Sequence, residues 1–200
     1  MNLRKFWKLF LSTALVGCLL GALSAVTELF HVSLQTGIIT GGFLSATTMM
    51  GFWAYLTLNF TMRNFVSFRI WQIIQVLLIA LVFYDLIYFR WLWTGKGEGS
   101  LTPFVLFAIW PLLIAFVAAF VKGKISGMKN FIPAVFFLYV MTGVEWFVAL
   151  KSNAGLQTTL IGLILLGCNV YILFMYTRLL NQPNDKNELG ATVKQPSPVK

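Results

Sequence analysis

Three acidic residues lie within or at the edge of long apolar stretches of the chain, where an ionised group is costly to keep. They are Glu28, Asp85 and Glu145. A carboxylate surrounded by hydrocarbon needs a charged or hydrogen-bonding partner, and such a residue usually marks a functional position. Arg90 follows Asp85 closely and can supply a positive charge. These four residues are therefore the first candidates for chemistry.

The sequence predicts that Glu28, Asp85 and Glu145 lie at similar depth in a membrane, near Arg90, and that these four residues form a polar cluster if they face inward. Such a cluster can act as a charge-paired structural lock, as a proton or cation site, or as a small-ligand pocket. The alternative is that each acid reaches the membrane surface or bonds a neighbouring helix separately. Structural pairing is favoured, because a buried acid needs a partner before it needs a function. Whether the three acids share one pocket stays open.

Two glycine pairs have the spacing that allows transmembrane helices to approach closely. Gly17 and Gly21 form one pair, and Gly37 and Gly41 form the other. Glycine has no side chain, so two helix backbones can touch at such positions. Packing within the bundle is the favoured interpretation, because this spacing is common. The alternative is that these glycines form a docking face for another membrane protein.

Catalytic and metal-binding patterns are poorly represented. The chain has no phosphate-binding glycine loop, no zinc-protease motif and no serine-hydrolase elbow. Tyr84-Asp85 resembles the Tyr-Asp pair of intramembrane aspartyl proteases, but no second aspartate lies in an apolar stretch. One histidine and two separated cysteines offer no metal-ligand set. We therefore expect no enzyme activity, no cofactor and no metal.

The elements that must position these residues are membrane helices. Hydrophobic residues make up 58% of the chain and charged residues 10%, a composition typical of a multi-pass α-helical membrane protein. About 20 apolar residues at ~1.5 Å each cross the hydrocarbon core of a bilayer. The sequence predicts an all-α integral membrane protein, a six-transmembrane-helix bundle occupying residues 1–180. The predicted spans are 9–30, 36–60, 70–89, 101–121, 131–150 and 154–177.

Basic residues predict how this bundle is oriented. Of the 15 Lys and Arg residues, only Arg90, Lys96 and Lys151 fall on one side of the six-span arrangement, and the other 12 fall on the opposite side. Cytoplasmic loops carry the excess of basic residues, so both termini are predicted to be cytoplasmic. This distribution explains the net charge of +9 without nucleic acid as a partner. Residues 181–200 are polar and are predicted to form a disordered cytoplasmic tail.

Several segments resemble the KbaA family of KinB-signalling pathway activation proteins from spore-forming bacilli. The most specific is FYDLIYFRW (Phe83 to Trp91), and MGFWAYLTL (Met50 to Leu58) precedes it. NFIPAVFF (Asn130 to Phe137), Glu145-Trp146 and CNVY (Cys168 to Tyr171) are similar too. The resemblance extends from the first span to Arg178, with the same length and six-span plan.

The resemblance implies a multi-pass cell-membrane regulator that activates the sensor histidine kinase KinB, and through it the sporulation phosphorelay. It brings no catalytic residues with it. Intramembrane contact with a KinB-like kinase within the lipid bilayer is the expected mechanism. A different class of function stays open from the residues alone. Six-span proteins of this size also serve as substrate-binding or small-solute transport subunits of membrane uptake systems.

Overall fold

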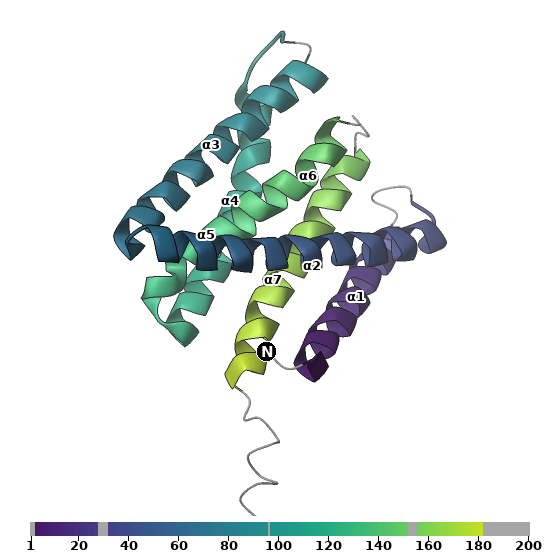
Figure 1. The fold of residues 1–200 in the computed structure, drawn as a ribbon. Helices are drawn as coiled ribbons and strands as arrows, with labels where there is room; N and C mark the ends of the chain where they lie inside the picture. Colours follow the sequence, from purple (N-terminus) through teal and green to yellow (C-terminus); the bar gives the residue numbers. More distant parts are fainter. Residues whose placement is uncertain (1–2, 28–31, 96, 152–155, 182–200) are drawn as a thin grey trace, which may run out of the picture.

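The computed structural model describes residues 3–27, 32–95, 97–151 and 156–181, and this part of the chain is all helical. The expected all-α class is therefore correct. Figure 1 shows the helices, which are α1 (Leu3–Val26), α2 (Leu34–Phe65), α3 (Phe68–Thr94), α4 (Thr102–Ser126), the short 3₁₀ turn η1 (Met128–Asn130), α5 (Phe131–Phe136), the π-helical turn η2 (Phe137–Met141), α6 (Thr142–Lys151) and α7 (Leu156–Asn181). Of the predicted tail, 181–200, Asn181 is the last residue of α7, and residues 182–200 lie outside the described residues.

Five helical segments in the described part of the chain are long and apolar enough to cross a membrane. They are Leu3–Val26, Phe68–Trp93, Thr102–Ser126, Met128–Phe147 and Gln157–Leu180. The predicted second span, 36–60, lies within α2, which is not among them. At 32 residues α2 is the longest helix, about 48 Å at ~1.5 Å per residue, but glycine, serine and threonine lower its mean hydropathy.

The helices form one bundle in which α2 crosses several of the others. Figure 1 shows α2 running across the front of the bundle, from the end of α1 to the start of α3. Along this path α2 contacts α1, α7, η2 and α6. The start of α1 and the end of α7 lie on the same side of the bundle, whereas the loop from α3 to α4 lies on the opposite side (Figure 1). Successive helices therefore alternate in direction.

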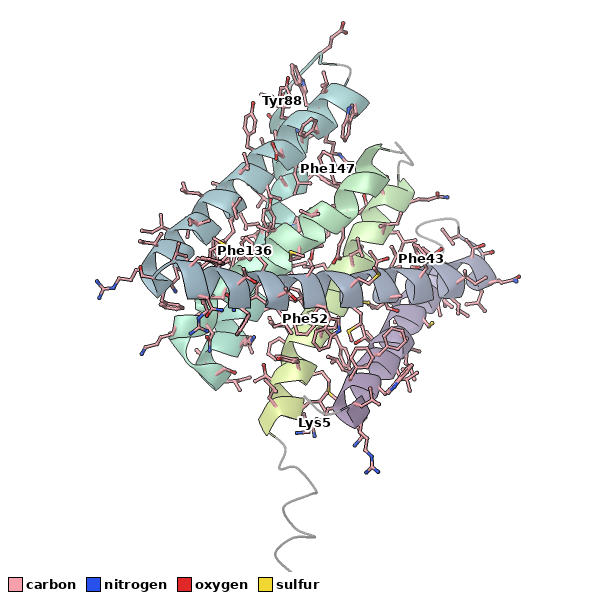
Figure 2. The ribbon with its side chains drawn as sticks, in the orientation of Figure 1. Lys5, Phe43, Phe52, Tyr88, Phe136 and Phe147 are labelled. Atoms are coloured by element: carbon pink, nitrogen blue, oxygen red, sulfur yellow. The ribbon has the colours of Figure 1, made fainter. Side chains whose placement is uncertain are left out.

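The core lies around the segmented helix α5–η2–α6 and around α7. In the most apolar 18-residue stretch of Met128–Phe147, 61% of the residues are buried, compared with 17% in that of Phe68–Trp93, so the former is central and α3 is peripheral. Phe52 of α2 lies at the centre in Figure 2, with ring centroids 4.9 Å from Tyr176 and 5.4 Å from Phe137. Edge-to-face contacts of this kind stabilise aromatic cores beyond the area that they bury.

The π-helical turn η2 interrupts the central helix where it is most buried. Residues Phe137, Leu138, Tyr139 and Val140 are all buried. The Tyr139 hydroxyl donates a hydrogen bond to the carbonyl oxygen of Ala108 in α4, at 3.2 Å. A π turn holds one residue more than an α turn, so the residues after it are rotated by about 100° relative to an unbroken α-helix. The sequence analysis predicted one regular helix over 131–150 and gave no sign of this turn.

Candidate functional site

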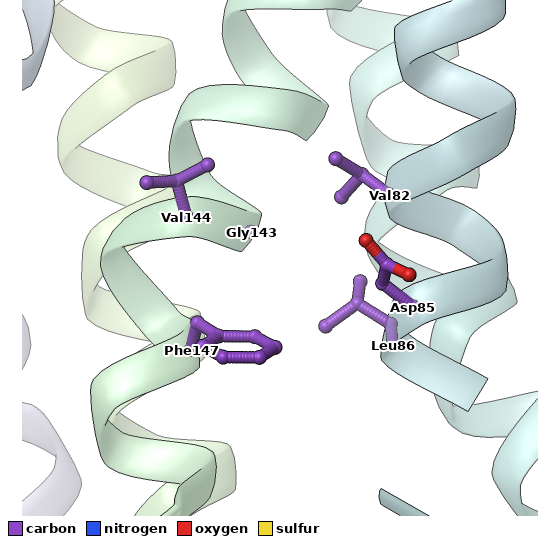
Figure 3. Close-up of a pocket in the computed structure, with 6 residues that line it drawn as sticks. All are labelled: Val82, Asp85, Leu86, Gly143, Val144 and Phe147. Carbon is purple, nitrogen blue, oxygen red and sulfur yellow. The ribbon is translucent and has the colours of Figure 1, made fainter. Parts of the chain in front are cut away.

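Asp85 lies in a notch between α3 and α6, which we call the α3–α6 notch. Val82, Asp85 and Leu86 line it from α3, and Gly143, Val144 and Phe147 line it from α6, around a volume of about 240 Å³. Figure 3 shows the Asp85 carboxylate pointing into this space. At its inner wall the two helices are close because Gly143 lacks a side chain: a Cβ atom there would lie 2.8 Å from Cγ1 of Val82. Its lining is otherwise apolar.

Asp85 has no hydrogen-bond or ion-pair partner within the described residues. Arg90 does not pair with it, because five positions along an α-helix separate the two side chains by about 140° around the axis. The Arg90 guanidinium instead lies over the ring of Phe107 in α4, 3.3 Å from its centroid. This cation–π contact satisfies the arginine and leaves the carboxylate without a counterion.

Glu145 lies at a different place, where α6 meets α2 and α7. Its Oε2 accepts a hydrogen bond from Nδ2 of Asn169 at 3.3 Å, and the same Nδ2 donates to Oγ1 of Thr142 at 2.9 Å. The other carboxylate oxygen, Oε1, points at Gly51 of α2 and has no hydrogen-bond partner in the described part of the chain. The Oδ1 atom of the fully buried Asn169 also has none. We call Thr142, Glu145 and Asn169 the polar triad.

The structure therefore does not bring the predicted cluster together. Glu145 and Gly143 are two residues apart, so they project from roughly opposite faces of α6. Gly143 faces Asp85 and Glu145 faces α2 and α7, which puts the two acids on different sides of the same helix. Arg90 is directed at α4, and Glu28 lies outside the described residues. Within the described residues, Asp85 and Glu145 therefore occupy two separate polar positions and not the single cluster that the sequence suggested.

The four glycines lie together in the contact between α1 and α2. A Cβ atom on any of Gly17, Gly21, Gly37 or Gly41 would come closer than 3.0 Å to the carbonyl oxygen of the glycine that faces it. The pairs are Gly17 with Gly41 and Gly21 with Gly37. We call this contact the glycine seam. Because the two helices occupy it themselves, the exposed surface of α1 is a different one, formed by Leu11, Leu15, Leu19 and Leu23, each more than half exposed.

Asn169 and Thr142 were missed as site residues by the sequence analysis. The available signal was a polar side chain in each of two otherwise apolar spans, since a buried amide or hydroxyl needs a hydrogen-bond partner. Nothing in the spacing paired them, because they belong to different helices. No three His, Cys, Asp or Glu side chains within the described ranges are placed to hold a metal ion.

Comparison with known proteins gives a consistent result. Residues 10–179 match the model of the KbaA family, whose description is KinB-signalling pathway activation in sporulation. The KinB-signaling pathway activation protein of Bacillus subtilis (strain 168) is 32% identical over 136 residues, which cover 68% of this chain and 69% of the relative. No solved structure matches the chain. The matched range includes α2 to α6 entire and most of α1 and α7, so it contains the notch, the triad and the seam.

Proposed function

Because the chain belongs to the KbaA family of KinB-signalling pathway activation proteins, we propose that it is a multi-pass cell-membrane regulator that increases the activity of a KinB-like sensor histidine kinase. The family match over residues 10–179 carries this proposal. The described part of the chain contributes membrane helices and short connections, which suit a regulator that acts by contact rather than by turnover.

The proposed membrane arrangement has six crossings and cytoplasmic termini. Five long apolar segments support it directly, and the large apolar side chains on their outer faces support lipid as the surrounding solvent. In this arrangement α2 is the sixth crossing, and its 32 residues require a strong tilt, because only about 20 are needed to cross. Lys5 and Tyr88 lie at opposite ends of the bundle in Figure 2, with the basic N-terminal end toward the cytoplasm.

The mechanism we propose is stabilisation of the active kinase conformation. A protein that binds the active and inactive conformations of a kinase equally well does not change their populations. Activation therefore requires tighter binding to the active conformation. Moving a kinase from 1% to 50% active needs a differential affinity of about 100-fold, or ~2.7 kcal/mol. A few specific contacts between membrane helices supply a free energy of that size.

The proposed function predicts a kinase-dependent sporulation defect. In a strain that sporulates through the KinB-like kinase alone, deleting the gene for this chain should lower the frequency of heat-resistant spores at least tenfold. Expression of the chain from another locus should restore it. In a matched strain that uses a different sporulation kinase, the deletion should have little effect. Equal sporulation with and without the chain in the first strain would contradict the proposal.

The membrane arrangement predicts opposite accessibility at two positions. In a chain with Cys18 and Cys168 replaced by alanine, Lys194→Cys should react with an impermeant thiol reagent only after the cells are opened. Glu98→Cys, in the loop between α3 and α4, should react in intact cells. The readout is a mass shift of the purified protein. Labelling of Lys194→Cys in intact cells would exclude the proposed orientation.

A further inference from the structure

The α3–α6 notch combines three features that are not used by the packing of this chain. It holds a carboxylate that has no partner among the residues that the structure describes, it is open on one side, and its walls are apolar. Leu81, Tyr84 and Val144 flank it and are each more than half exposed. An occupant therefore approaches from the surrounding membrane, between α3 and α6, rather than through the bundle.

The depth of Asp85 restricts what that occupant is. The aromatic side chains at the end of α3, including Tyr88 and Trp91, mark the membrane surface on that side. Asp85 lies one turn deeper than Tyr88, and the rings of Tyr84 and Tyr88 stack at 5.7 Å along the exposed side of the helix. A carboxylate at this depth is costly unless a cationic group reaches it.

The wall opposite Asp85 is rigid and suited to a cation. Phe147 packs against both Phe89 and Trp93, with ring centroids 5.1 Å and 5.2 Å away, and those two rings stack on each other at 5.1 Å. A positively charged group in the notch would meet the carboxylate on one side and an aromatic ring on the other. Such a ring attracts a cation most strongly where water is excluded. The volume of about 240 Å³ has room for the end of one side chain.

We propose that the α3–α6 notch is the docking site for a transmembrane helix of the partner kinase, which inserts one basic side chain against Asp85. This inference rests on the proposed function for the identity of the partner. The absence of a side chain at Gly143 lets α3 and α6 approach each other at the inner wall of the notch, and the exposed Leu81, Tyr84 and Val144 form the apolar contact around the charged pair. A basic residue in the outer half of a membrane helix identifies the partner segment.

The first test changes the charge while keeping the shape. Asp85→Asn, expressed in the kinase-dependent strain that lacks the chromosomal copy, should lower spore frequency at least tenfold while the protein accumulates in the membrane at the wild-type level. Glu98→Gln, in the exposed loop after α3, is the matched control and should sporulate normally. Val144→Trp fills the notch from its exposed rim without touching the charge, and it should lower sporulation as well.

The second test identifies the occupant. A photoreactive residue at Val144 should crosslink to the kinase in wild-type membranes, and Asp85→Asn should remove the crosslink. The same residue at Leu106, which is exposed on α4, should not crosslink to it. Suppressors of Asp85→Lys should replace a basic residue in a membrane helix of the kinase by Asp or Glu, and they should rescue no glycine-seam variant.

Three outcomes would overturn the docking inference. The first is normal sporulation of both the Asp85→Asn and the Val144→Trp variants. The second is equal crosslinking to the kinase from positions 144 and 106. The third is an amine-bearing phospholipid that copurifies with the wild-type chain but not with Asp85→Asn. Each leaves the proposed function standing as long as the wild-type chain restores sporulation. Failure of the wild-type chain to restore it would instead remove the proposed function.

Discussion

Gly37→Val should separate α1 from α2 and lower the free energy of unfolding by about 3 kcal/mol, the upper end of the usual range for overpacking. Gly37 faces Gly21 so closely that even one added carbon would overlap the opposite backbone. A backbone has no alternative rotamer, so the helices themselves must move apart. Thermal unfolding of the purified protein in detergent measures the effect, and sporulation should fall with it.

Ala54→Val is the matched control for that experiment. Ala54 lies on the same helix but is exposed, so a valine there introduces the same β-branched side chain without meeting another part of the chain. We expect the unfolding temperature of this variant to stay close to that of the wild type. If Gly37→Val were as stable as Ala54→Val, the glycine seam would not be the contact that holds α1 in place.

Gly162→Ala should destabilise the contact between α6 and α7 by about 2 kcal/mol, although alanine normally favours helix by about 1 kcal/mol over glycine. The added methyl group would overlap the ring of Trp146. That ring is 1% exposed, and its Nε1 donates a hydrogen bond to the carbonyl oxygen of Thr158 at 2.6 Å. Phe107 and Trp110 pack against it, so it cannot turn aside. The measurement is again thermal unfolding in detergent.

Gly167→Ala supplies the comparison on the same helix. Its new methyl group would meet only the end of the Leu20 side chain, which can change rotamer. Little loss of stability is therefore expected there, or a small gain from helix propensity. The interpretation would fail if the two alanine variants unfolded at the same temperature, because the fixed ring is the one difference between the sites.

The position of features along the chain was predictable, and their direction around each helix was not. Apolar length located the helices, and the glycine spacing indicated where close packing was possible. The helical repeat alone separates Asp85 from Arg90 by about 140°, so their predicted pairing was wrong for a reason already present in the sequence. The separation of Asp85 from Glu145 does not follow from the helical repeat, because it depends on which neighbours surround α6.

Two elements escaped prediction for physical reasons. The turn η2 has no proline or glycine to mark it, since its five residues FLYVM are ordinary in an apolar helix. Tertiary packing of these buried side chains decides the local geometry there. The polar triad joins Thr142 and Glu145 to Asn169 across two helices, and one sequence carries no record of such pairing.

The one surplus residue held in η2 sets the orientation of everything that follows it in α6. If the same five residues, Phe137 to Met141, were wound as a regular α-helix, Gly143 would no longer face Val82 and Glu145 would no longer reach Asn169. The membrane-facing notch and the interior triad therefore share a single determinant, although they lie on opposite faces of α6. A change of winding at this turn would therefore rotate the notch residues and the triad residues of α6 together.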